Sequence, residues 1–149
     1  MAKLAPNDCP FCRIIEGSDP EAQVVGEGET WVAFFPLQPA TRGHTLVVPR
    51  VHISDFWHAD QRTAANLAAA CVDIGRALQA VLAPEGMNLI TSAGEVAEQT
   101  VFHLHFHVVP RWRDDGIDPI WPSSSDEPER ASAALAEAVR RAVGSPQGD

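Results

Sequence analysis

The sequence has few cysteines, no long apolar run and little positive charge. Three cysteines in 149 residues, two of them spaced C-x-x-C, do not make a disulfide framework, so we expect a reducing, cytoplasmic location. No apolar run approaches the ~20 residues of a membrane span, and the N-terminus lacks the apolar stretch of a signal peptide. The formal net charge of −9 argues against nucleic-acid binding but allows a small phosphorylated ligand at a locally positive site. We therefore expect a protein that binds neither membranes nor nucleic acids.

The order of apolar segments predicts an α+β fold with a five-stranded antiparallel sheet. We expect one domain over 1–149, with a core over about 9–116 and a C-terminal helical extension over about 124–143. A long helix is expected from Asp60 to Leu82, because apolar residues recur there at spacings of three and four. A second helix is expected over 131–143. The expected strands are short and lie at 24–25, 31–35, 44–48, 87–90 and 101–109.

Three histidines alternate with apolar residues in the stretch 101–109. Period-two alternation predicts a half-buried strand with His103, His105 and His107 on one face. Neighbouring imidazoles on such a strand lie roughly 6.5–7 Å apart, so several can reach one small anion or one metal ion. The alternative is a polar strand face whose histidines are there by chance. Because half of the six histidines lie in this one strand, we favour a functional role.

This stretch resembles the signature of the histidine triad family, in which three histidines alternate with apolar residues. The flanks Gln99-Thr100 and Pro110-Arg111 resemble the branch that holds the dinucleoside-polyphosphate hydrolases and their bacterial relatives. The resemblance extends back through 43–49 and 9–12. It implies a two-fold homodimer that pairs through the long helix and the sheet edge. Apolar residues beside the main helix stripe could serve that partner or belong to the core: Ala65, Ala68, Ala69 and Val72.

The resemblance also implies a chemistry for the triad. His105 would attack the α-phosphorus of a nucleotide and form a nucleotidyl-histidine intermediate, which water then hydrolyses. His107 would hydrogen-bond the phosphoryl or bridging oxygen and assist proton transfer, and His103 completes the catalytic triad. The residues expected to bind the substrate are Gln99, Thr100, His107, His44 and Ser92. His44 could orient the triad from behind or be a buried structural histidine.

Cys9 and Cys12 have the spacing of zinc ligands. The resemblance supplies His52 and His103 as the other two ligands, which makes a closed, structural zinc site. We expect no organic cofactor. Two free thiols in a short helix are the alternative, and a catalytic metal held by all three triad histidines is another. Two further residues are expected to play no part: Cys71 in the core and His58 on the surface.

Three positions depart from the family pattern. Pro36 stands where relatives place an Asp or Asn that binds the ribose hydroxyls, and proline offers no side-chain hydrogen bond. Ser92 stands near an expected Asn, and Glu98 replaces a glycine in the loop beside the phosphates. We expect a hydrolase or nucleotidyl transferase acting on a dinucleoside polyphosphate or a nucleoside phosphoramidate. The alternative is a non-catalytic module of the same fold that senses nucleotides.

Overall fold

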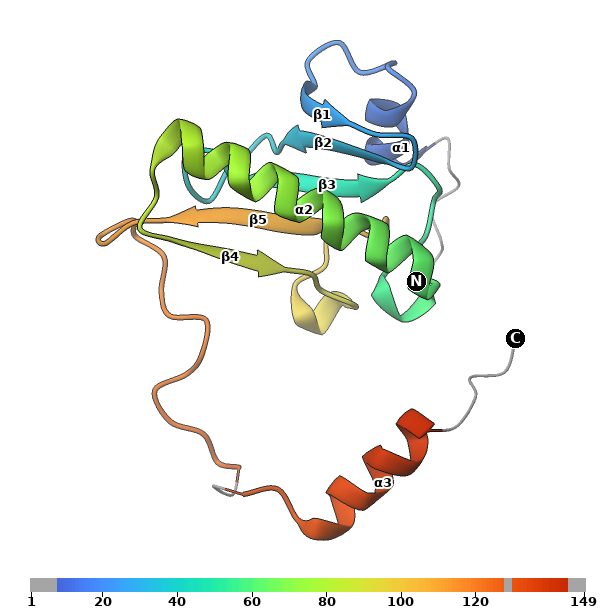
Figure 1. Cartoon of the computed structure of the whole chain (residues 1–149), viewed down its shortest axis with the longest axis vertical. Coiled ribbons are helices and arrows are strands. Elements are labelled where there is room, and N and C mark those ends of the chain that lie inside the picture. Colours follow the sequence, from blue (N-terminus) through green and yellow to red (C-terminus); the bar gives the residue numbers. More distant parts are fainter. Residues whose placement is uncertain (1–7, 128–129, 145–149) are drawn as a thin grey trace. The chain divides into compact units, whose positions relative to one another are not determined.

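A five-stranded antiparallel sheet forms the centre of the protein (Figure 1). The structure is a computed structural model that describes residues 8–127 and 130–144. The strand order is β1-β2-β3-β5-β4. This confirms the predicted α+β class and the predicted antiparallel sheet. The strands are β1 Gln23–Glu27, β2 Trp31–Phe35, β3 Thr45–Pro49, β4 Gly86–Ile90 and β5 Phe106–Arg111.

The long helix α2, Gln61–Leu82, packs on one face of the sheet. Its first turn is capped by the Asp60 carboxylate, which accepts a hydrogen bond from the Thr63 N–H at 2.9 Å. The predicted stripe faces the sheet and is buried through Leu67, Cys71, Ile74 and Leu78. By length and hydropathy alone this is the one described helix that could cross a membrane. The core helix of a soluble protein passes the same test, and the packing of this stripe fits that explanation.

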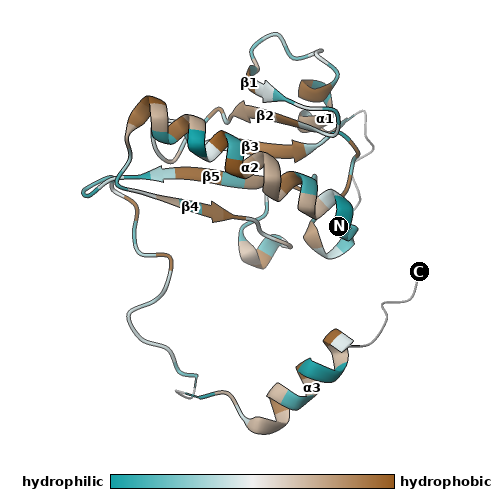
Figure 2. Cartoon of the chain, in the orientation of Figure 1, coloured by the Kyte–Doolittle hydropathy of each residue, from teal (hydrophilic) through white to brown (hydrophobic). Residues whose placement is uncertain are grey.

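The opposite face of the sheet is covered by the short helix α1, Pro10–Ile15. Phe11 of this helix contacts Phe34 edge to face, with ring centroids 5.2 Å apart. Side chains of β2 and β3 alternate between this face and the α2 face, because successive residues of a strand point to opposite sides. Figure 2 shows the resulting apolar stretches along β2, β3 and β5. The two faces therefore have separate apolar cores.

The fifth strand begins later than its alternating pattern predicts. Residues 101–105 form bends and irregular backbone, and β5 starts only at Phe106. The Leu104 N–H donates to the carbonyl of Ile53 at 2.6 Å rather than to a neighbouring strand. The prediction of a strand over 101–105 was therefore wrong. His103 and His105 therefore lie on a segment of bends and irregular backbone outside the sheet ladder.

The chain divides into two compact units, Met1–Ile117 and Asp118–Asp149. The second unit contains helix α3, Ala133–Gly144, close to the helix predicted over 131–143. Leu135, Val139 and Val143 recur at helical spacing and are all exposed. α3 is therefore an amphipathic helix.

Candidate active site and metal site

His105 is held in one tautomer by the backbone. Its Nδ1 lies 2.7 Å from the carbonyl oxygen of His103. A carbonyl only accepts, so Nδ1 carries the proton and Nε2 keeps its lone pair. Burial lowers the pKa of His105 and favours the neutral ring, and this effect exceeds that of the hydrogen bond to His103, which raises the pKa. The Thr91 hydroxyl donates to the carbonyl of His105 at 2.9 Å and fixes the backbone there. This arrangement provides an oriented nucleophilic nitrogen.

His107 receives a hydrogen bond from His44. The Ala40 N–H donates to His44 Nδ1 at 3.0 Å, so the proton of a neutral His44 lies on Nε2. That Nε2 lies 2.9 Å from His107 Nδ1, which must then accept. His107 therefore carries its own proton on Nε2. Burial and the neighbouring rings of His105 and His44 lower the pKa of His107 to about 4.

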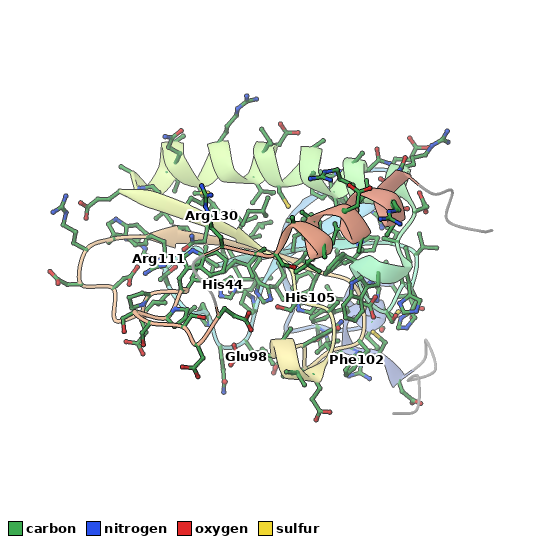
Figure 3. The ribbon with its side chains drawn as sticks, turned by 90° about the horizontal axis from the view of Figure 1, so that it is seen from below. His44, Glu98, Phe102, His105, Arg111 and Arg130 are labelled. Atoms are coloured by element: carbon green, nitrogen blue, oxygen red, sulfur yellow. The ribbon has the colours of Figure 1, made fainter. Side chains whose placement is uncertain are left out.

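The triad lies on the α1 side of the sheet. The rings of His105 and His107 are 4.8 Å apart, and Phe11 packs edge to face on His105 at 5.1 Å. Figure 3 shows His44 and His105 in the same part of the molecule, with Glu98 and Phe102 on the segments that lead to His105. The predicted common face is consistent with these contacts. His103 and His105 are both buried.

Gln99 is buried and bonded to backbone groups. Its Nε2 donates to the carbonyls of Ser54 at 2.6 Å and Val101 at 3.1 Å. Its Oε1 accepts from the Gly94 N–H at 2.9 Å. These contacts close the turn over 94–99. The predicted phosphate contact of the Gln99 side chain stays a prediction, as do those of Thr100, which is exposed, and Ser92, which is half-buried.

Glu98 lies at the end of the same turn with a left-handed backbone. Its φ is +66°, a conformation that suits glycine and is strained for other residues. The other two departures from the family pattern lie elsewhere: Pro36 directly follows β2, and Ser92 lies two residues before the turn begins at Gly94. The backbone at Glu98 thus has the shape that a glycine would adopt.

Four predicted metal ligands come together beside the triad. The ligand atoms of Cys9, Cys12, His52 and His103 all lie within 4.8 Å of one another. His52 Nδ1 is 3.3 Å from Cys12 Sγ, and His103 Nδ1 is 3.6 Å from each sulfur. With Zn–S near 2.3 Å and Zn–N near 2.0–2.1 Å, a tetrahedral site has an S···N edge of about 3.6 Å. The donor set and its spacing therefore fit a zinc ion.

The His103 ring is oriented for such a site by the backbone. Its Nε2 lies 2.9 Å from the carbonyl of Pro49 and donates to it, so Nδ1 presents a lone pair to the two sulfurs. Burial raises the pKa of Cys12 to about 11, with Cys9 adding to the effect, and lowers the pKa of His103 to about 4. Without a cation the Cys12 thiol is therefore protonated, and metal binding must release its proton.

The catalytic-metal alternative finds no support in the described part of the chain. Only one group of potential metal ligands is present there, and it includes His103 but neither His105 nor His107. Cys71 lies in the core, as predicted. His58 is exposed, as predicted, and its Nδ1 is 2.7 Å from the Asp55 carboxylate.

Sequence reasoning missed several supporting residues. Phe11 packs against two of the triad rings, and Thr91 holds the His105 backbone. The side chains of Ser54 and Asp55 contact each other and His58 next to the Gln99 contact. No sequence motif singles out these residues, because their roles depend on contacts between distant segments.

Comparison with known proteins identifies the family. The HIT-domain family model matches residues 18–114. The chain belongs to the HIT-domain family. The "Protein hit" of Bacillus subtilis is 37% identical over 121 residues, which cover 80% of this chain and 83% of that protein. An "Adenosine 5'-monophosphoramidase hnt1" of Schizosaccharomyces pombe is 29% identical over 126 residues, covering 84% of this chain and 91% of that protein.

Solved structures of HIT proteins have the same fold. SMU.412c from Streptococcus mutans superposes with a TM-score of 0.83 and 38% identity, covering 93% of this chain and 87% of that one. A zinc-bound histidine triad family protein from Mycobacterium smegmatis has a TM-score of 0.72 and 36% identity, covering 80% and 86% of the two chains. The first of these similarities confirms the predicted HIT-like architecture.

Proposed function

We propose that this HIT protein hydrolyses nucleotide conjugates at the α-phosphate through a covalent nucleotidyl-histidine intermediate. The observation that carries the proposal is the hydrogen bond from His105 Nδ1–H to the carbonyl of His103, which leaves Nε2 as a free nucleophile. The phosphoramidase name of the Schizosaccharomyces pombe relative supports a nucleoside phosphoramidate as one substrate. A dinucleoside polyphosphate, cleaved at the same phosphorus, is the other.

In the first step the lone pair of His105 Nε2 forms a bond to the α-phosphorus, and the bond from phosphorus to the leaving group breaks. A phosphate or nucleotide leaves as an anion, and an amine takes up a proton from solvent. In the second step the oxygen of a water molecule forms a bond to the phosphorus, the bond between phosphorus and His105 Nε2 breaks, and the water loses a proton to solvent. This releases the nucleoside monophosphate and restores His105. The protein supplies an oriented nucleophile and fixed hydrogen-bond donors.

His107 acts in this scheme as a hydrogen-bond donor. Its Nε2–H points away from the His44 contact and is available to a phosphoryl or bridging oxygen. General-acid catalysis would require a protonated ring, and the pKa near 4 opposes protonation in the free protein. His44 positions His107 from behind, and Thr100 and Ser92 supply further polar contacts to the phosphate.

We also propose a structural zinc ion, held by Cys9, Cys12, His52 and His103. The tetrahedral spacing of the four ligand atoms and the zinc-bound relative support this assignment. When bound, the ion supplies a rigid link between the α1 segment and the segment that carries His103. The thiol ligands require reducing conditions, which is consistent with a cytoplasmic location.

A homodimer is the third part of the proposal. Residues beside the buried stripe of α2 are exposed: Ala65, Ala68, Ala69 and Val72. Small and apolar exposed side chains on a long helix suit contact with a second copy. Sedimentation of the purified protein should give twice the chain mass, and Ala68→Glu should reduce it.

The experiment that tests the activity is turnover of adenosine phosphoramidate, diadenosine polyphosphate and their guanosine forms. Wild type should release a nucleoside monophosphate, and His105→Asn should lose at least about a thousandfold in kcat. Acid-free quenching should trap one nucleotidyl group per chain on the wild type, detectable by intact mass. If no substrate turns over while a nucleotide still binds, the non-catalytic sensor replaces the hydrolase.

A further inference from the structure

A groove lies on the face of the sheet opposite the triad. It has a volume of about 380 Å³ and lies between the C-terminal half of α2 and the strands β1 to β3. Ile74, Leu78 and Thr45 form its inner wall. The triad rings contact Phe11 on the other face, so the sheet separates the two sites. Nothing in the proposed chemistry uses this hollow.

The lining is apolar and partly open to solvent. Val81 is 79% exposed, Val25 43% and Phe35 36%, and all three border the same hollow. Contiguous exposed apolar side chains in a soluble domain commonly mark a binding surface. The volume lies at the lower end of the range of small-molecule sites, about 300–1,000 Å³. A compact, mainly apolar molecule therefore fits better than a large cofactor.

One cation borders the hollow. Arg42 is exposed and is the only charged residue in the lining. In the part of the chain that the structure describes it has no ion pair, whereas Arg50, Arg111 and Arg113 each face a carboxylate. A guanidinium beside an apolar groove complements a carboxylate attached to an apolar body.

We propose that this groove binds a medium-chain aliphatic carboxylate, with its chain between α2 and the sheet and its carboxylate on Arg42. The groove is also lined by the segment that carries His44. Gly43 and Thr45 line it, while His44 between them donates to His107 on the other face. A Cβ on Gly43 would lie 2.5 Å from Leu82 Cδ1, so the backbone and the helix are already in close contact there. A ligand in the groove would therefore contact the residues on either side of His44.

Decanoate is the probe for this site, measured by isothermal titration calorimetry on the full chain. Saturable binding is expected, together with amide shifts at Gly43 and Thr45 in nuclear magnetic resonance spectra. Ala77→Trp should fill the groove. Val81→Glu should repel the ligand's carboxylate and remove an apolar contact with its chain, and Val81 is exposed, so no buried residue is changed. Both should weaken binding by about tenfold or more, the size of effect expected from blocking an apolar pocket. Ala80→Trp is the matched control, because Ala80 is exposed on the same helix outside the lining.

Charge recognition is tested separately. Arg42→Gln should weaken decanoate binding about threefold to fivefold, the size of a partly exposed ion pair. The same change should leave binding of decan-1-ol unaltered. Arg76→Gln, an exposed arginine of α2 outside this groove, should change neither. Absence of saturable binding, or equal binding by wild type and Ala77→Trp, would overturn the proposal. So would a wild-type oligomer that Ala77→Trp dissociates, because a second copy would then occupy the groove.

Discussion

The Nδ1 atom of His105 lies 2.7 Å from the carbonyl oxygen of His103, and the ring of His103 faces Cys9 and Cys12. One residue thus contacts both the proposed nucleophile and two of the other candidate metal ligands. Its ring is a zinc ligand in our proposal, and its carbonyl fixes the tautomer of His105. A change at the proposed metal site should therefore shift the His103 carbonyl and, with it, the orientation of the His105 ring.

The metal prediction follows from this link. Purified wild type should contain about one zinc per chain, as expected for a closed four-ligand site. Cys12→Ser should lose most of the zinc and, because His103 is then free to move, lower kcat about tenfold to a hundredfold. Elemental analysis and turnover measure the two effects. Cys71→Ala is the control, because Cys71 lies in the core and should leave zinc content unchanged. Less than about one zinc per two wild-type chains would contradict the assignment.

Acidification should destabilise the fold through His107. Its pKa is near 4 in the folded chain against an ordinary value of 6.5, so the unfolded chain binds more protons between these values. The free energy of unfolding should therefore be highest above about pH 6.5 and fall as the pH drops towards 4. The lowered pKa values of His44 and His105, caused mainly by burial, act in the same direction.

Urea unfolding at pH 7 and pH 5 measures this effect. His107→Gln should show a smaller loss of stability over that interval than wild type, because the substituted side chain does not titrate. If the free energy of unfolding falls equally for His107→Gln and wild type between pH 7 and pH 5, His107 is not the group responsible.

The hydrogen bonds of the Gln99 side chain should stabilise the turn over 94–99. Gln99→Glu has nearly the same shape but replaces the Nε2 donor with an oxygen that faces the carbonyls of Ser54 and Val101. The change should lower the free energy of unfolding by about 1–3 kcal/mol, the cost of leaving buried groups without partners. It should also speed hydrogen exchange at the Gly94 amide in the absence of any nucleotide. Gln79→Glu, on the exposed side of α2, should do neither. If Gln99→Glu alters only the KM for substrate, Gln99 binds the phosphate and does not stabilise the turn.

The pattern of side chains in the sequence predicted the long helix and the four candidate metal ligands. The stripe of α2 was readable because burial of Leu67, Cys71, Ile74 and Leu78 requires helical spacing. The four candidate metal ligands were predicted because the family pattern joins His52 and His103 to the C-x-x-C pair, and the structure brings these residues together.

Backbone partners account for what the sequence left open. Alternation over 101–105 predicts a paired strand, but the Leu104 N–H donates to the carbonyl of Ile53 and the segment forms bends instead. The tautomers of the site depend on the Ala40 N–H and the Pro49 carbonyl. Every residue except proline carries the same backbone groups, so no residue pattern marks these contacts.

Glu98 should be less stable at its position than a glycine. Its φ of +66° places a side chain in the left-handed region, which costs a residue with a Cβ about 1–2 kcal/mol. Glycine avoids this strain but loses more backbone entropy on folding, by roughly 0.5–1 kcal/mol. Glu98→Gly should therefore raise the free energy of unfolding by up to about 1.5 kcal/mol. Glu95→Gly, in the same turn but without a positive φ, should lower it. Urea unfolding of both variants at pH 7 decides the matter, and equal destabilisation by the two changes would show that the backbone at Glu98 is not strained.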